Sequence, residues 1–155
     1  MNNYPQVITG KESVSEQDRP IQALINFYRA FNSADLVLME QNWLQSSTAS
    51  MSNPLGGVKR GWSEIRQVYE RIFNGPAQVY VEYYDYSLHQ SNEMFTVVGR
   101  ERGYFQLGAQ KLELAIRTSR IYCLNEGQWY QLHHHGSIDV PDNLSAYQGA
   151  VLQQN

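Results

Sequence analysis

The sequence of 155 residues contains one cysteine, Cys123, which excludes a disulfide within the chain. A lone thiol in a strand-like segment fits a reducing compartment, and packing is a better explanation for it than nucleophilic chemistry. Positive charge is not in excess either, because 12 Lys and Arg stand against 15 Asp and Glu, for a net charge of −3. A protein that binds nucleic acid usually presents a basic surface, so we do not expect a nucleic-acid partner.

Long apolar runs are absent as well, and no segment approaches the roughly 20 apolar residues of a membrane-spanning helix. The first ten residues lack the charged and then apolar pattern of a secretion signal. We therefore expect a cytoplasmic protein without a membrane partner. What the sequence has instead is a 42% hydrophobic fraction with 11 Tyr and 3 Trp, and such amphipathic rings suit pocket walls and subunit interfaces.

Helical patterning is confined to the first half of the chain. Residues 1–17 are polar and aperiodic, which predicts a flexible N-terminal arm. Apolar residues recur at helical spacing within 20–31, 34–44 and 61–73, so three helices are predicted. Asp18 and Pro20 suit the start of the first helix.

The second half of the chain is strand-like. Segments rich in Val, Tyr and other strand-forming residues are separated by turn signals, and they predict four long strands, at 78–88, 94–107, 111–124 and 128–138. Strands of this length must twist and curl. We predict an α+β domain over 18–139, a cone-shaped curved antiparallel sheet with three helices in its concavity and a pocket at its mouth. The prediction for 140–155 is a polar C-terminal tail, with a short helix through Leu144 and Tyr147 as one option.

The densest group of polar residues follows Trp129, in the order Trp-Tyr-Gln-Leu-His-His-His-Gly-Ser. If this strand is regular, Gln131, His133 and His135 share one face and His134 lies on the other. Imidazole titrates near neutrality, so His133 and His135 are candidates for a catalytic acid or base, with Gln131 as a ligand contact. Hydrogen-bonded structural histidines are the alternative. A metal site is not predicted, because no third ligand lies at a suitable spacing.

Arginines inside predicted strands form the second candidate group: Arg100, Arg102, Arg117 and Arg120. Arg117 and Arg120 cannot share a face of one regular strand, so at least one of them is expected to be buried or half-buried. A buried guanidinium needs a partner. That partner is either an acid within the protein, such as Glu82 or Glu113, or an anionic ligand held by two hydrogen bonds. Both options stay open at the level of sequence.

The glycine-rich segment 53–61 does not have the order of residues of a phosphate-binding loop, and no cofactor motif is present. We expect this loop to place Trp62 at the mouth of the cone. Trp43 and Tyr84 are expected to line the same pocket, and no cofactor is expected in it.

These motifs resemble those of the nuclear transport factor 2-like superfamily, in particular its SnoaL-like branch. The similar features are segment 56–61 before the third helix, Arg100 followed by Tyr104, Ser119-Arg120, and the segment 129–137, where the family shows Trp-x-x-Val-His-x-His-x-Ser. The chain also resembles the association domain of calcium/calmodulin-dependent protein kinase type II, although it has no kinase motifs. The resemblance extends from about Arg19 to Ser137.

The resemblance implies the cone fold, a deep pocket, and dimerisation through the sheet. Arg100 and Arg120 match pocket arginines of the association domain, which makes them the best candidates to bind an anionic group. The fold also hosts isomerases, dehydratases and cyclases, and fold alone does not choose among them. Two functions therefore stay open: a pocket protein for a small anionic organic ligand, which includes enzymes of these types, and a non-catalytic association module that forms a homodimer.

Overall fold

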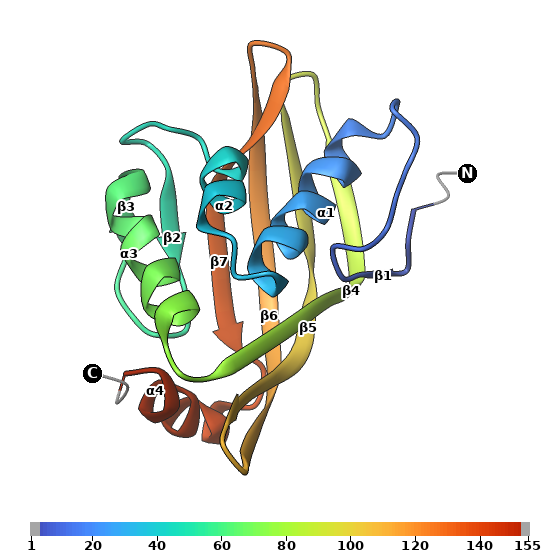
Figure 1. Ribbon diagram of the computed structural model, residues 1–155. Coiled ribbons are helices and arrows are strands. Elements are labelled where there is room, and N and C mark those ends of the chain that lie inside the picture. Colours follow the sequence, from blue (N-terminus) through green and yellow to red (C-terminus); the bar gives the residue numbers. More distant parts are fainter. Residues whose placement is uncertain (1–3, 153–155) are drawn as a thin grey trace.

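The computed structural model describes residues 4–152 and has the predicted α+β architecture, a strongly curved sheet that holds helices in its concavity (Figure 1). The elements in chain order are β1 (Val7–Ile8), α1 (Arg19–Asn32), α2 (Leu36–Asn42), β2 (Ser50–Ser52), β3 (Lys59–Arg60), α3 (Gly61–Asn74), β4 (Gln78–Gln90), β5 (Met94–Leu107), β6 (Gln110–Asn125), β7 (Gln128–Ile138), the 3₁₀ turn η1 (Pro141–Asn143) and α4 (Leu144–Leu152).

The sheet has the strand order β1-β4-β5-β6-β7-β2-β3. The long strands β4 to β7 form an antiparallel meander, as the turn signals between them predict. The sheet is not antiparallel throughout, because β2 runs parallel to β7 and pairs Ser50 with His133. This pairing places the edge formed by β2 and β3 beside the histidine-rich part of β7.

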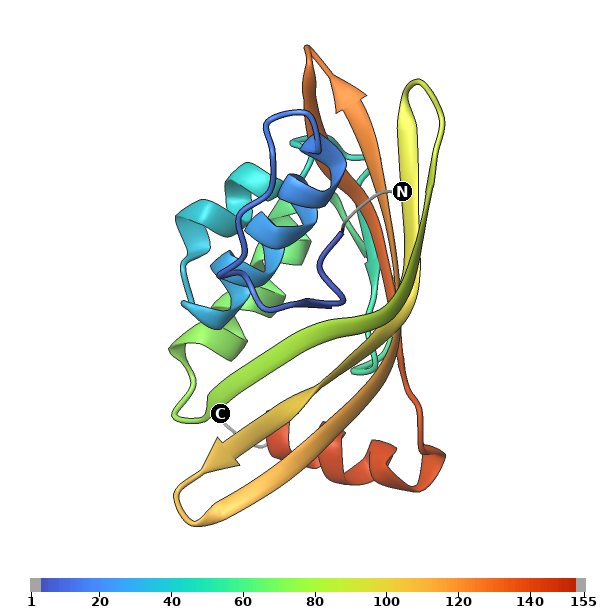
Figure 2. The same cartoon turned by 90° about the vertical axis from the view of Figure 1, so that its right-hand side faces the viewer.

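The three predicted helices lie on the concave side of the sheet (Figure 2). α1 begins with Pro20 in its first turn and buries a stripe that includes Leu24 and Tyr28 completely. Asp35 caps the start of α2: its carboxylate accepts a hydrogen bond from the Leu38 amide at 3.0 Å, which satisfies one free N–H of the first turn. Within residues 4–152, no helix combines the length and the apolar character that a bilayer crossing requires.

Two bulges change which side chains face the core. In β4 the register shifts between Tyr84 and Ser87, where Asp85 has a φ of 49°. In β7 the register shifts at Leu132, since Tyr122 pairs with Gln131 whereas Ile121 pairs with His133. An extra residue in one strand turns every following side chain to the opposite face. The regular alternation assumed from the sequence therefore fails beyond each bulge.

The segment before α1 is not a loose arm where the structure describes it. Val7 and Ile8 pair with β4, and the Ile8 side chain is completely buried. Arg29 of α1 donates a hydrogen bond from Nε to the Gly10 carbonyl at 2.8 Å. Sequence periodicity missed this strand because two residues are too few to show alternation. Residues 1–3 of the predicted arm lie outside the described part.

Candidate functional site

A narrow cavity of about 60 Å³ lies between the concave face of the sheet, α1, α3 and α4. Its walls are mostly apolar and aromatic, with Phe27 from α1, Tyr69 from α3 and Phe105 from β5 among them. Five groups that can ionise also line it: Tyr69, Glu101, Arg120, His134 and Tyr147. A mostly apolar hollow with a few polar groups is the usual form of a small-molecule site.

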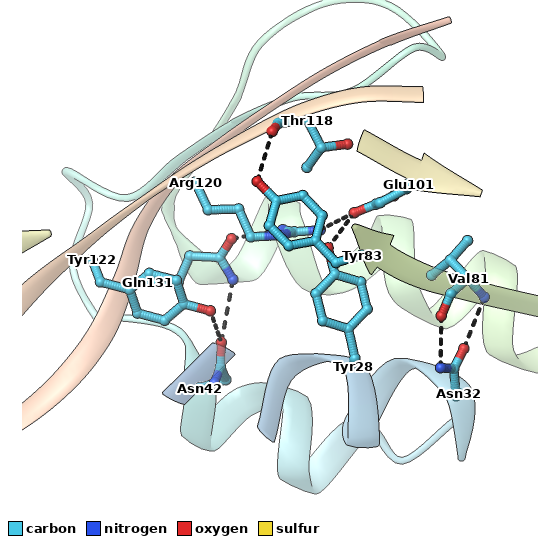
Figure 3. Close-up of polar contacts among 10 residues, drawn as sticks. All are labelled: Tyr28, Asn32, Asn42, Val81, Tyr83, Glu101, Thr118, Arg120, Tyr122 and Gln131. Atoms are coloured by element: carbon cyan, nitrogen blue, oxygen red, sulfur yellow. Dashed lines mark hydrogen bonds and ion pairs between the residues drawn. The ribbon is translucent and has the colours of Figure 1, made fainter. Parts of the chain in front are cut away.

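Arg120 of β6 is the central polar residue of this cavity and is only 1% exposed. One terminal nitrogen donates to Oε1 of Glu101 at 2.8 Å, and the other donates to Oε1 of Gln131 at 2.8 Å (Figure 3). The guanidinium also lies over the Phe27 ring, with its central carbon 3.6 Å from the ring centroid. A charge buried this deeply is tolerated only when it is paired and hydrogen-bonded, as it is here.

Glu101 of β5 is held from two sides. Its Oε1 accepts hydrogen bonds from Arg120 and from the Tyr28 hydroxyl, the latter at 2.6 Å (Figure 3). Among the described residues, no hydrogen bond reaches its other oxygen, Oε2. One carboxylate oxygen thus fixes the side chain, while the second stays free to accept a hydrogen bond or a proton.

A polar network anchors the far end of this group. The side-chain amide of Gln131 donates to Oδ1 of Asn42 at 3.3 Å, and the Tyr122 hydroxyl donates to the same oxygen at 3.0 Å. Asn42 in turn donates to the backbone oxygen of Ala23 in α1 at 2.8 Å. Gln131, which orients Arg120, therefore links the sheet to the helices. These hydrogen bonds fix the position of the Arg120 side chain in the absence of a ligand.

Several buried polar atoms beside the cavity lack a hydrogen-bond partner among the described residues. They include the Tyr69 hydroxyl, Nε of Arg120, and both ring nitrogens of His134. Leaving such a group unpaired costs about 1–3 kcal/mol. Against the larger effect of burial, Trp43 and Arg120, whose side chains are both hydrogen-bond donors, act on the Tyr69 oxygen and lower the pKa of its hydroxyl. The hydroxyl hydrogen of Tyr69 therefore needs an acceptor that residues 4–152 do not supply.

The protonation states follow from burial. Burial, reinforced by the nearby charge of Arg120, holds the pKa of His134 well below its ordinary value, so its imidazole is neutral at neutral pH. Burial also raises the pKa of Tyr69 far above the ordinary range of tyrosine, so its hydroxyl keeps its proton. The cavity accordingly holds one positive and one negative group, together with neutral donors and acceptors.

His133 and His135 do not enter the cavity, contrary to the prediction. The bulge at Leu132 turns them to the outer face of the sheet and brings His134 inside. On the outer face, Nδ1 of His133 shares a hydrogen bond of 2.7 Å with the Ser50 hydroxyl, and His135 is exposed. Gln131 precedes the bulge, and the structure places it inside, where it holds Arg120.

Arg100 and Tyr84 also lie outside the cavity. The side chain of Arg100 is 51% exposed and forms ion pairs with Asp85 at 3.1 Å and Asp139 at 3.3 Å. Tyr84 lies under the Arg102 guanidinium on the outer face. Of the two arginines in β6, Arg120 faces the cavity and Arg117 faces the solvent. The acid that pairs with Arg120 is neither Glu82 nor Glu113 but Glu101, which alternation places opposite Arg100 and Arg102.

The two tryptophans expected in the pocket belong to the core around it. Trp43 is completely buried and contacts Tyr69 with its ring, while Nε1 of Trp62 donates to Glu40 at 2.8 Å. Neither lines the cavity itself. Arg120 is the one predicted site residue that lines the cavity, and the polar lining residues that were not predicted include Glu101, Tyr69, His134 and Tyr147. Glu101 could have been found from sequence, as the one acid between two strand arginines.

A group of three or more side chains suited to hold a metal ion is not found among residues 4–152. His133 and His135 lie on the outer face of the sheet with ring centroids 6.3 Å apart. Two imidazoles without a third ligand do not make a site of the usual tetrahedral kind.

A long curled sheet that encloses helices around a narrow cavity defines the class of nuclear transport factor 2-like, or cystatin-like, folds. Within this class the chain belongs to the SnoaL-like domain family, whose profile matches residues 21–141. No curated protein matches the sequence significantly.

Solved structures agree on this fold. A proposed dehydratase of the nuclear transport factor 2-like family from Streptomyces avermitilis superposes with a TM-score of 0.70 at 17% identity, covering 79% of this chain and 95% of that one. A proposed association domain of calcium/calmodulin-dependent protein kinase type II from Thiobacillus denitrificans gives 0.63 at 19% identity, covering 77% and 94%. An uncharacterised cystatin-like protein from Caulobacter vibrioides gives 0.67 at 16%, covering 88% and 97%. At such identities the similarity concerns the fold alone.

Proposed function

We propose that this protein binds a small organic molecule in the cavity, with an acceptor oxygen of the ligand facing Tyr69 and Arg120. The observation that carries the proposal is the set of unpaired donors, the Tyr69 hydroxyl and Nε of Arg120, beside an otherwise apolar hollow. A carbonyl or carboxylate oxygen would accept from both. Ordered water could fill the same role in a protein without a ligand, so binding has to be measured.

The charge balance bears on which oxygen the site prefers. The sequence left open whether a buried strand arginine pairs with an acid of the protein or with an anionic ligand, and the family resemblance favoured the anionic ligand. Glu101 already neutralises Arg120 at 2.8 Å, and an added carboxylate would lie near the free Oε2 of Glu101. Like charges at close range in a low dielectric repel strongly. An uncharged carbonyl compound is therefore the better candidate, and a carboxylate the weaker one.

The test compares acetone and acetate as probes, by ligand-observed NMR and thermal shift on the full chain. We expect acetone to bind more tightly than acetate. Tyr69→Phe should weaken acetone binding about five- to tenfold, because one neutral hydrogen bond is worth roughly 1 kcal/mol. Tyr130→Phe, a change on the outer face, is the matched control and should have no effect. Binding of neither probe, or equal binding by Tyr69→Phe, would contradict the proposal.

Proton-transfer catalysis is a second candidate function, of the isomerase, dehydratase or cyclase type. It is supported by Oε2 of Glu101, which no hydrogen bond from the described residues occupies, and by the neutral ring of His134, since each presents a lone pair to which a substrate proton can be transferred. Acetone again serves as the probe, in deuterium oxide. Catalysed exchange of its methyl protons by the wild-type protein that is lost in a Glu101→Gln variant shown to be folded would support this function, and a wild-type exchange rate equal to that of buffer would count against it.

We also propose a homodimer through the outer face of the sheet, the association function left open by the sequence. Val98 is 49% exposed in the middle of this face, and Arg100 and Asp139 lie on the same side of the sheet. An apolar patch with charges of both signs can pair with a second copy across a two-fold axis. Light scattering should give twice the chain mass, and Val98→Glu should give a monomer. A monomeric wild-type protein at micromolar concentration would exclude this partner.

A further inference from the structure

Helix α4 follows the last strand and contains no charged residue. Tyr147 and Val151, which lie one turn apart, both line the cavity. The Val151 side chain is 3% exposed. Burial, and to a smaller extent the charge of Glu101, raises the pKa of the Tyr147 hydroxyl far above its ordinary range. The segment expected to be a polar tail therefore forms a wall of the candidate site.

With α4 in this position the cavity admits very little. Its volume is about 60 Å³, whereas an engineered apolar cavity of about 150 Å³ is known to admit benzene. Only molecules of a few non-hydrogen atoms fit beside the sheet. Tyr147 is the largest side chain that α4 contributes, so its ring sets this limit.

Apolar packing holds α4, and its polar contacts with the rest of residues 4–152 are few. Among the described contacts one side-chain hydrogen bond joins it to the rest of the protein, from Nε2 of Gln148 to the Pro54 carbonyl at 3.2 Å, and no ion pair does. A helix of nine residues has little stability of its own, and Gly149 lowers it further. On the side of α4 toward the β5–β6 hairpin lies an open groove, lined by Phe105 and Leu112 among others, into which the helix has room to move.

The chain before α4 is anchored more firmly. The Asp139 amide donates to the Ala115 carbonyl at 2.9 Å, and the Asp139 carboxylate pairs with Arg100. Val140, the next residue, is 48% exposed. A movement of α4 about this point leaves the sheet and its ion pair of Arg120 and Glu101 in place.

Resting on the ligand-binding function proposed above, we propose that α4 is the movable wall of the site and that Tyr147 determines the size of ligand it accepts. Uncharged molecules of a few non-hydrogen atoms bind with the helix in place. Larger rings enter only when the Tyr147 ring is displaced or removed.

Benzene is the probe for this proposal, because it lacks an oxygen and its binding does not depend on the donors of Tyr69 and Arg120. We expect the full-length Tyr147→Ala variant to bind benzene, seen as a rise in melting temperature in benzene-saturated buffer and as shifts in the NMR spectrum. The wild-type protein and the outer-face control Tyr130→Ala should show neither. Tyr69→Phe added to Tyr147→Ala should leave benzene binding unchanged, which separates this proposal from the ligand-binding proposal.

Should Tyr147→Ala fail to fold, Tyr147→Leu keeps apolar packing on α4 while it removes the ring, and it is expected to show the same gain of benzene binding. Benzene binding by the wild-type protein to the same extent, or its absence in a folded Tyr147 variant, overturns the proposal. Hydrogen exchange supplies a second measurement. Amides of α4 should exchange at least tenfold faster than those of β6, and equal protection of the two would show that the wall does not move on its own.

Discussion

The inner and outer faces of the sheet carry the same kinds of residue in opposite surroundings. Inside, Arg120 pairs with Glu101 at 2.8 Å and both side chains are almost completely buried. Outside, Arg102 pairs with Glu82 at 2.7 Å, and about half of the arginine side chain is exposed. The distances are nearly equal, yet water screens the outer pair and not the inner one. Burial rather than distance therefore decides how much each pair matters.

The largest expected effect comes from breaking each ion pair. Glu101→Gln leaves the Arg120 charge buried and uncompensated, which should lower the free energy of unfolding by about 3–5 kcal/mol. Glu82→Gln removes the outer partner and should cost less than about 1 kcal/mol. Urea unfolding of both variants measures the difference. Equal losses would show that the inner charge is better solvated than its 1% exposure indicates.

Tyrosine hydroxyls sharpen the same comparison. The Tyr28 hydroxyl donates to buried Glu101 at 2.6 Å, whereas that of Tyr80 donates to Glu82, whose side chain is 21% exposed, at 2.9 Å. Tyr28→Phe should cost about 1.5–3 kcal/mol, the usual value of a hydrogen bond to a buried charge. Tyr80→Phe should cost less than about 0.5 kcal/mol. Chemical unfolding of both variants at pH 7 measures these losses. A larger loss of unfolding free energy in Tyr80→Phe than in Tyr28→Phe would contradict the dependence on burial.

The histidines of β7 differ in their pH dependence. Because burial lowers the pKa of His134, the unfolded chain takes up a proton at a pH where the folded protein does not. Stability from this group is therefore complete above the unfolded pKa of about 6.5 and falls as the pH drops below it, by up to about 1.4 kcal/mol per pH unit. Melting temperatures between pH 7.5 and 5 should fall less in His134→Gln than in the wild-type protein.

The matched control for this prediction is His135→Gln on the exposed outer face, which should retain the wild-type pH dependence. The pKa of His133 is also lowered, mainly by burial, so a smaller dependence in the same direction is expected to persist in His134→Gln. An unchanged slope in His134→Gln would mean that the ring is protonated in the folded protein.

The smallest effect on stability is expected at Tyr69. Its hydroxyl is buried without a partner, so Tyr69→Phe removes no hydrogen bond that the described residues supply. Unfolding free energy should stay equal or rise by less than about 1 kcal/mol. Tyr83→Phe is the control, because that hydroxyl donates to the Thr118 carbonyl at 3.0 Å and its loss should destabilise the protein by about 1 kcal/mol. A clear loss at Tyr69 would reveal a partner within the fold.

The sequence predicted the helices, the four long strands and the curved α+β sheet, because these elements are long enough for their apolar periodicity to be unambiguous. The faces of the last strand were predicted wrongly for a local reason. Nothing in the Gln131-Leu132-His133 segment indicates a bulge. The extra residue, Leu132, turns His134 to the inner face of the sheet and His133 and His135 to the outer face. The sequence did predict a buried arginine in β6, since Arg117 and Arg120 cannot both face outward on a regular strand.

Other parts of the site depend on tertiary contacts that no local pattern encodes. Tyr69 belongs to a stripe typical of a helix core, and only the surrounding donors distinguish its hydroxyl from any other. The C-terminal segment, predicted as a polar tail, forms a wall of the cavity because Tyr147 and Val151 pack at its end. Such a short helix is stabilised by what it packs against, and its own propensity is weak.

The most direct test of the account is a crystal structure at high resolution from crystals soaked in acetone. We predict density for acetone in the cavity, with its carbonyl oxygen within hydrogen-bond distance of both the Tyr69 hydroxyl and Nε of Arg120. A cavity that keeps only water at saturating acetone, or a carbonyl oxygen directed away from both donors, would contradict the proposed site.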